Sequence, residues 1–97
     1  MSTPLTIVAH IQAVQGQGDF VKKELLKLIE PTLKEKGCIQ YDLQNENNNP
    51  EQFLFFEIWE NRELWQDHMQ TPHILEFIDT IEDYLENFSV QEMTKIS

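Results

Sequence analysis

The segment Glu57–Phe77, EIWENRELWQDHMQTPHILEF, joins the end of a predicted strand to two predicted helices. It contains two Trp, two His and several carboxylates, and nowhere else in the chain do aromatic and titratable side chains gather so densely. Aromatic side chains commonly shape small apolar pockets, and a His or Glu in the wall of such a pocket can move a proton. We therefore expect any chemistry on a small molecule to take place here.

The strand that leads into this segment is predicted over 53–60, FLFFEIWE, where the alternation of side chains is informative. Successive side chains of a strand point to opposite faces of the sheet. One face then carries Phe53, Phe55, Glu57 and Trp59, and the other carries Leu54, Phe56 and Ile58. Because the second set is wholly apolar, we expect it to face the helices. The first set includes a carboxylate, and we expect it to face a second sheet.

The rest of the chain divides into helices and strands on either side of this segment. Asn61 is a candidate cap for a short helix that runs through Met69, and Thr71 followed by Pro72 predicts the start of another helix. The apolar stripe of that helix is expected at positions 74, 78, 81 and 85. A final strand is predicted to follow Asn87, with the sequence FSVQEMTKI.

Upstream, the alternating pattern of Leu5–Val14 predicts the first strand. An amphipathic helix follows, which Pro31 should kink near its end because proline removes a backbone donor. Gly37 should end this helix, and CIQYDLQN, from Cys38, is predicted to be the second strand.

The predicted order is strand, helix, strand, strand, broken helix, strand. This is a split βαβ pattern of the α+β class, in which a four-stranded antiparallel sheet carries helices on one face. Residues 1–97 are expected to form one domain. Such a sheet would leave an apolar patch exposed on its other face, and a second copy of the chain would cover it.

Composition limits the possible partners and the compartment. Seventeen acidic residues against seven basic ones give a formal net charge of -10, which repels nucleic acid and anionic membrane surfaces. A single cysteine excludes an intramolecular disulfide, and the N-terminus does not resemble a signal peptide, so a cytoplasmic location is expected. No apolar stretch approaches the roughly 20 residues that span a bilayer.

The candidate catalytic residues are Glu57 and His68, either of which could act as the base. The candidate substrate-binding residues are Trp59, Trp65, His73, Tyr41, Phe55 and His10. The side of the sheet to which His10 points depends on a strand register that the sequence leaves open.

No metal or bound cofactor is predicted. His68 and His73 are five residues apart with no acidic third ligand nearby on the same helix, and this spacing matches none of the common zinc signatures. Glycine occurs only at positions 16, 18 and 37, so a glycine-rich loop for a nucleotide or flavin is not supported.

Three sequence features together resemble the antibiotic biosynthesis monooxygenase family, and most closely its quinol monooxygenase branch. They are GCIQYDL from Gly37, the strand ending EIWEN, and LWQDHMQTPHILEF from Leu64. The resemblance implies a ferredoxin-like dimeric α/β barrel with a pocket in each subunit. It also implies oxidation of quinols or polyketide anthrones by molecular oxygen without metal or flavin, in which the protein deprotonates the phenol.

Individual positions favour the quinol branch. Glu57, His68 and His73 match it, whereas Phe55 and Trp65 stand where the polyketide-oxidising members carry Asn and Tyr. The leading hypothesis is a homodimeric quinol monooxygenase. The alternatives are a non-catalytic dimer that binds a small aromatic ligand, and an isomerase of a small sugar-like signalling metabolite.

Overall fold

The structure is a computed structural model and describes residues 3–97. Its strands are β1 (Leu5–Ala13), β2 (Cys38–Asn45), β3 (Gln52–Trp59) and β4 (Leu85–Met93). Its helices are α1 (Gly18–Leu26), α2 (Ile29–Leu33), α3 (Arg62–His68) and α4 (Pro72–Ile81), and a single 3₁₀ turn, η1 (Glu82–Tyr84), precedes β4. Within the described residues, no helix is both long enough and apolar enough to cross a membrane.

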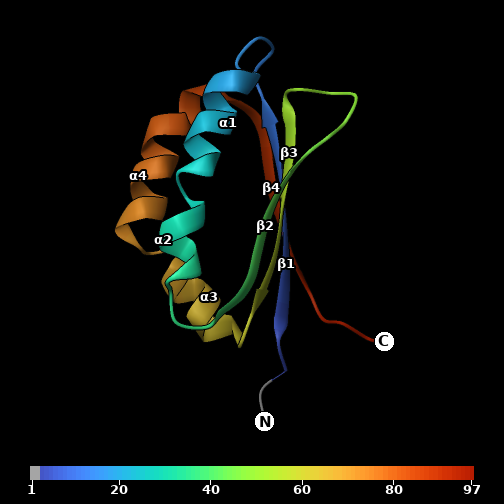
Figure 1. Cartoon of the computed structure of the whole chain (residues 1–97), viewed down its shortest axis with the longest axis vertical. Coiled ribbons are helices and arrows are strands. Elements are labelled where there is room, and N and C mark those ends of the chain that lie inside the picture. The colour runs from blue at the N-terminus through green and yellow to red at the C-terminus, as the bar shows by residue number, and fades with distance from the viewer. Residues whose placement is uncertain (1–2) are drawn as a thin grey trace.

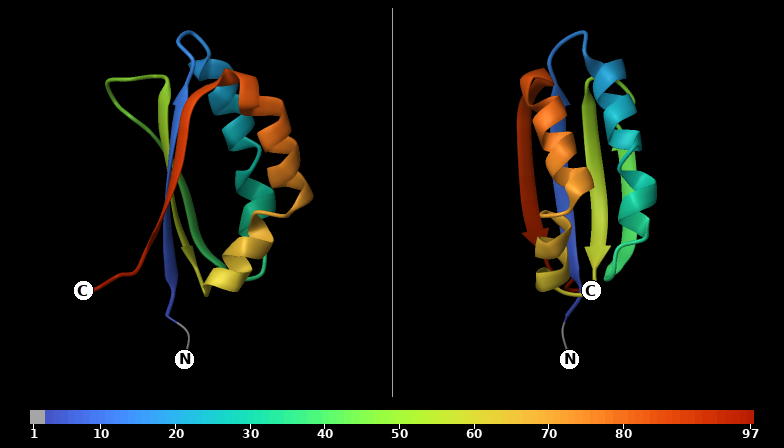
Figure 2. Two further views of the ribbon diagram at one scale, coloured as in Figure 1. Left: turned by 180° about the vertical axis from the view of Figure 1, so that it is seen from behind. Right: turned by 90° about the vertical axis from the view of Figure 1, so that its left-hand side faces the viewer.

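The four strands form one antiparallel sheet in the order β2-β3-β1-β4. All of the helices lie against the same face of this sheet, and within residues 3–97 no helix covers the other face (Figures 1 and 2). The predicted α+β architecture is therefore confirmed, including the ferredoxin-like order of strands and helices. We call the uncovered side of the sheet the open face.

The alternation predicted for β3 is correct, but the two sides were assigned the wrong way round. Phe53, Phe55 and Trp59 are at most 3% exposed and belong to the core beneath the helices. Each lies opposite a β1 residue of the same face, and these partners are Ile11, Ala9 and Leu5. Leu54, Phe56 and Ile58, which we expected to face the helices, are half-buried on the open face.

The error has a physical cause. Both faces of β3 are mostly apolar, so hydrophobic alternation could not decide which of them meets the helices. A carboxylate at Glu57 favours a face away from the helices, because an unpaired carboxylate is costly to bury in a core. In the structure Glu57 is 4% exposed on the helix side and accepts a hydrogen bond from Trp59 Nε1 at 2.9 Å. A partner within the same strand makes the buried carboxyl tolerable.

The first helical region is broken earlier than predicted. The kink was expected at Pro31, but α1 ends at Leu26 and α2 begins at Ile29. Proline lacks an N–H and crowds the carbonyl of the residue four positions before it, which here is Lys27. The break therefore falls one turn before the proline, and Thr32 N–H resumes the helical pattern with Leu28 O at 3.1 Å.

The predicted caps of the later helices are confirmed. The side chain of Asn61 accepts from Leu64 N–H at 2.9 Å, and that of Thr71 accepts from Ile74 N–H at 3.4 Å. The last strand begins earlier than expected, because Leu85 pairs with Ala13 in the sheet instead of extending the helix. A short turn joins α3 to α4, with His68 at the end of α3 and His73 at the start of α4.

Candidate functional site

The turn between α2 and β2 places Glu35 beside the end of α3. Gly37 makes this arrangement possible, because it adopts a φ of +89°. A Cβ at Gly37 would lie only 2.5 Å from Leu64 Cδ1 of α3. Glycine therefore supplies both the backbone conformation and the close approach that bring Glu35 to the site.

The α3–α4 junction holds the two His residues in place. His68 is the last residue of α3, and His73 is the second residue of α4. Between them, Thr71 Oγ1 donates to His68 O at 2.8 Å while it caps α4. The same hydroxyl lies 3.3 Å from His73 Nε2. One threonine thus joins the end of α3 to the start of α4.

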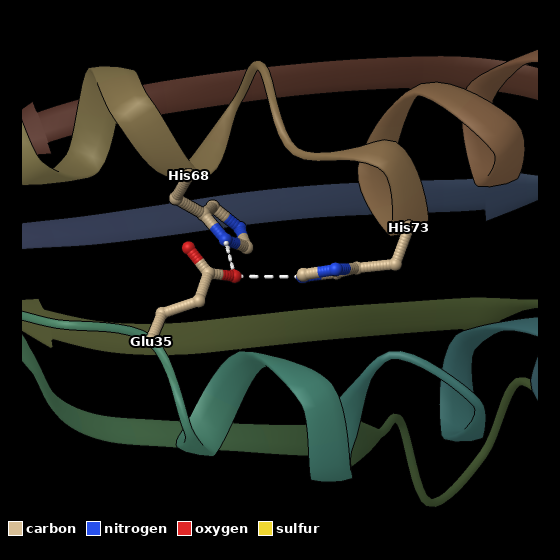
Figure 3. Close-up of side chains that lie close together, drawn as sticks. All are labelled: Glu35, His68 and His73. Carbon is tan, nitrogen blue, oxygen red and sulfur yellow. Dashed lines mark hydrogen bonds and ion pairs between the residues drawn. The ribbon is translucent and has the colours of Figure 1, made fainter.

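Glu35, His68 and His73 meet in a single cluster (Figure 3). Glu35 Oε2 lies 2.7 Å from His68 Nδ1 and 2.7 Å from His73 Nε2. The side chains are 14%, 2% and 24% exposed, in the order Glu35, His68, His73. A carboxylate only accepts hydrogen bonds, so both of these ring nitrogens donate.

The ring of His68 is enclosed on its other sides by aromatic groups. Its centroid lies 4.7 Å from that of Trp59 and 5.7 Å from that of Tyr41. Burial lowers the pKa of His68, and the hydrogen bond with Glu35 opposes this effect. With Nδ1 held by Glu35, Nε2 is the ring nitrogen left to meet another molecule.

His68 lines a cavity of about 440 Å³, counting its open mouth, between the sheet and the helices α3 and α4. The ionisable groups in its wall are Tyr41, Glu57 and His68. The remaining wall is mainly apolar and includes Ile7, Ile11, Leu28, Met69, Phe77 and Val90.

Glu57 lies in this wall and keeps its proton unusually well. Burial raises its pKa to about 7, although the hydrogen bond from Trp59 acts in the opposite direction. The negative charge of Glu35 raises the pKa further. Near neutral pH the carboxyl of Glu57 can therefore either give or take a proton.

The cavity wall also contains two hydrogen-bond donors, Tyr41 and Trp65. Tyr41 stacks on Phe55 with ring centroids 4.6 Å apart, and burial together with the charge of Glu57 raises the pKa of Tyr41 well above its usual range. Its phenol stays protonated and can donate. Trp65 also lines the cavity, and its buried Nε1–H has no hydrogen-bond partner among the described residues. A buried donor of this kind is available to an acceptor on a bound molecule.

The structure gathers most of the predicted site residues. Those in the cavity wall are Glu57, His68, Trp65, Tyr41 and Phe55. Trp59 lies behind the wall, where it contacts both Glu57 and His68. His73 reaches the cavity only through Glu35 and His68. His10 lies opposite Leu54 on the open face, away from the cavity, because its neighbours Ala9 and Ile11 point toward the helices.

Sequence reasoning missed Glu35. It stands in the charged run LKEKG between Lys34 and Lys36, which reads as an ordinary solvated turn. It is 33 residues from His68 and 38 from His73, so no local spacing connects the three. The only local signal was Gly37, which marks a turn but does not say what the turn approaches.

The chain matches one protein-family model over most of its length. The family model described as antibiotic biosynthesis monooxygenase matches residues 4–80. The uncharacterized protein sll1783 of Synechocystis sp. is 36% identical over 86 residues, which cover 84% of this chain and 56% of that protein. The chain thus spans about half the length of this relative.

The chain matches two further proteins over most of their length. The probable quinol monooxygenase YgiN of Escherichia coli is 28% identical over 93 residues, which cover 84% of this chain and 89% of YgiN. The crystal structure of PA3566 from Pseudomonas aeruginosa has a TM-score of 0.95 and 33% sequence identity. That match covers 100% of this chain and 98% of the other.

The raised pKa of Glu57 predicts a pH-dependent loss of stability that Glu57→Gln removes. Below about pH 4.5 the carboxyl is protonated in both states, whereas between about pH 4.5 and 7 the unfolded chain loses this proton and the folded chain keeps it. The penalty therefore grows as pH rises and is complete above pH 7. Glutamine avoids it and still accepts from Trp59. We expect the stability of Glu57→Gln relative to wild type to rise by about 2–3 kcal/mol between pH 5 and pH 8, measured by urea unfolding.

The matched control is Glu30→Gln, whose side chain is 84% exposed. Its stability relative to wild type should change little over the same pH range. If the free energies of unfolding of Glu57→Gln and wild type differ by the same amount from pH 5 to pH 8, then Glu57 ionises as freely in the folded chain as in the unfolded one, and the prediction is wrong.

Proposed function

The chain belongs to the antibiotic biosynthesis monooxygenase family, and on this premise we propose that it oxidises a quinol, or a similar electron-rich aromatic, with molecular oxygen. The observation that carries the proposal is the 2.7 Å contact between Glu35 Oε2 and Nδ1 of the buried, cavity-lining His68. We propose His68 as the general base and Glu35 as the residue that positions it.

The first step is removal of a phenolic proton by His68 Nε2. Glu35 holds the proton of the ring on Nδ1, which leaves the lone pair of Nε2 directed to the substrate. Once His68 takes the phenolic proton, the adjacent carboxylate stabilises the imidazolium, as an acidic residue does for the base of a hydrolase triad. The lowered pKa of His68 keeps the imidazole neutral at pH 7, as a base must be.

The second step is transfer of an electron from the bound quinolate to oxygen. A C–O bond then forms, and cleavage of the O–O bond places one oxygen atom on the ring and releases the other as water. Quinol and O₂ together thus give a hydroxyquinone and water. Tyr41 and Trp65 supply donors for the substrate oxygens, and Glu57 supplies a proton to the reduced oxygen.

The apolar wall also supports a second candidate, a protein that binds a small aromatic ligand without turnover. Apart from the groups described above, the cavity offers few polar contacts. The isomerase hypothesis is less well supported, because no Lys or Arg lines the cavity within the described residues to bind a phosphorylated substrate. The reducing cytoplasm would suit all three, since the single cysteine forms no intramolecular disulfide.

We further propose that residues 1–97 act as one domain in a homodimer whose two sheets pack through their open faces. At the centre of the open face Val8 of β1 lies opposite Phe56 of β3, with Leu54 and Ile58 two residues to either side of Phe56, and all four are half-buried. A second copy would bury this patch, as the family resemblance implies. This arrangement replaces the predicted one, in which Phe53 and Trp59 met the partner.

Oxygen consumption with a reduced naphthoquinol tests the activity. We expect the wild-type protein to exceed the uncatalysed rate, and His68→Ala to lower kcat/KM by at least about 100-fold, because general-base catalysis contributes factors of this size. Glu35→Gln keeps the shape of the side chain but removes its charge, and should lower kcat/KM by at least about tenfold. The exposed Glu30→Gln should leave the rate unchanged.

Two outcomes would contradict this account. A His68→Ala variant with the wild-type rate would remove His68 from the mechanism. No uptake above the uncatalysed rate, together with an aromatic ligand that native mass spectrometry finds unchanged on the protein, would favour the binding protein over the enzyme.

Sedimentation tests the proposed dimer. At micromolar concentration we expect the mass of two 11.5 kDa chains. Phe56→Asp places a charge at the centre of the open face and should give a monomer, because an unpaired charge is costly to bury between sheets. Leu33→Asp is the matched control, since Leu33 is 53% exposed on α2 in the helix layer. A monomeric wild type, or a dimeric Phe56→Asp variant, would rule out this interface.

A further inference from the structure

We propose that Glu35, His68 and His73 form a binding site for a divalent transition-metal ion of the zinc class. The proposal goes beyond the oxidation proposed above. The binding of the ion does not depend on that oxidation, but the effect of the bound ion on turnover does. The site would take one ion per chain between α3, α4 and the turn before β2.

The positions of the ligand atoms support this site. One donor atom from each residue lies within 4.8 Å of the other two. Bonds of about 2.0–2.1 Å in tetrahedral geometry place ligand atoms about 3.3 Å apart. The carboxylate oxygen now lies 2.7 Å from each ring nitrogen, so an ion requires these groups to separate by about 0.6 Å.

The surroundings permit such a movement. Glu35 projects from a turn, and His73 is in the first turn of its helix. Both are partly exposed, so a hydrated ion can approach from their side. His68 is fixed by its burial and by the ring of Trp59, so it supplies the rigid ligand. Figure 3 shows the two imidazoles approaching the carboxylate from different sides.

The ligand types select the metal. Two imidazoles and one carboxylate are the protein ligands of many catalytic zinc sites, which leave a fourth position for water. Imidazole nitrogen suits zinc and its neighbours in the transition series, whereas magnesium and calcium prefer oxygen ligands. The net charge of -10 raises the local concentration of any cation, so selectivity for zinc over magnesium is the distinguishing property.

Metal binding would change the chemistry of His68. An ion on Nδ1 displaces the proton that Glu35 otherwise holds there, and a neutral ring then carries its proton on Nε2. That nitrogen becomes a donor and can no longer remove a proton from a molecule in the cavity. On the proposed function, zinc at this site is therefore an inhibitor.

Titration calorimetry of the metal-free protein with ZnCl₂ tests the site. We expect one ion per chain for the wild type and no comparable binding of MgCl₂. Glu35→Gln and His73→Ala should each weaken zinc binding by at least about tenfold. Glu30→Gln is the matched control, because the Glu30 side chain is 84% exposed on α2 and should leave binding unchanged.

The proposal is overturned if wild-type protein binds no zinc, if magnesium binds equally well, or if Glu35→Gln and His73→Ala both bind zinc as the wild type does. Loss of binding in Glu30→Gln would also overturn it. Oxygen consumption then tests whether bound zinc inhibits turnover. Saturating zinc should reduce the rate of the wild type to that of His68→Ala. An unchanged rate excludes inhibition through His68. Calorimetry needs no turnover, so failure of the oxidation proposal would leave the binding result intact.

Discussion

The carboxylate of Glu35, shared by two imidazoles, connects the two halves of the chain at the site. It comes from the turn that follows the first helical region, whereas His68 and His73 come from the second. Three features bring them together: the positive φ of Gly37, its contact with Leu64, and the threonine that closes the α3–α4 turn. The orientation of His68, and hence the identity of the ring nitrogen available to the cavity, depends on this contact.

Burial lowers the charge that the ionisable groups of the cavity wall would otherwise carry. Burial raises the pKa of Glu57 to about 7, lowers that of His68, and raises that of Tyr41. The charge of the cluster is instead carried by Glu35, on the side of His68 away from the cavity wall. On the proposed function, this cavity would hold an apolar aromatic molecule, with His68 as the base, Glu57 as the proton donor, and Tyr41 and Trp65 as further hydrogen-bond donors.

Local patterns in the sequence were sufficient for the order of the elements and for the three ionisable groups of the cavity wall, Tyr41, Glu57 and His68. The alternation of β3 correctly grouped Phe55 with Glu57, and the caps Asn61 and Thr71 correctly marked α3 and α4. The side of β3 that meets the helices could not be predicted, because both of its faces are mostly apolar and the partner of Glu57 was unknown.

The contribution of Glu35 could not be predicted for a different reason. The sequence argued against a metal because no acidic ligand accompanies His68 and His73 on their helix. The acidic residue comes instead from a distant turn, and only the packing of that turn against α3 reveals it. Contacts between residues more than 30 positions apart leave no periodic signal in one sequence.

The tautomer of His68 tests the central claim most directly. Long-range ¹⁵N–¹H NMR of metal-free protein labelled at histidine nitrogen reports which ring nitrogen carries the proton. At pH 7 the account predicts a neutral His68 with its proton on Nδ1 and a bare Nε2, and a change in the Nδ1 resonance in Glu35→Gln. A proton on Nε2, or an imidazolium at pH 7, would contradict it.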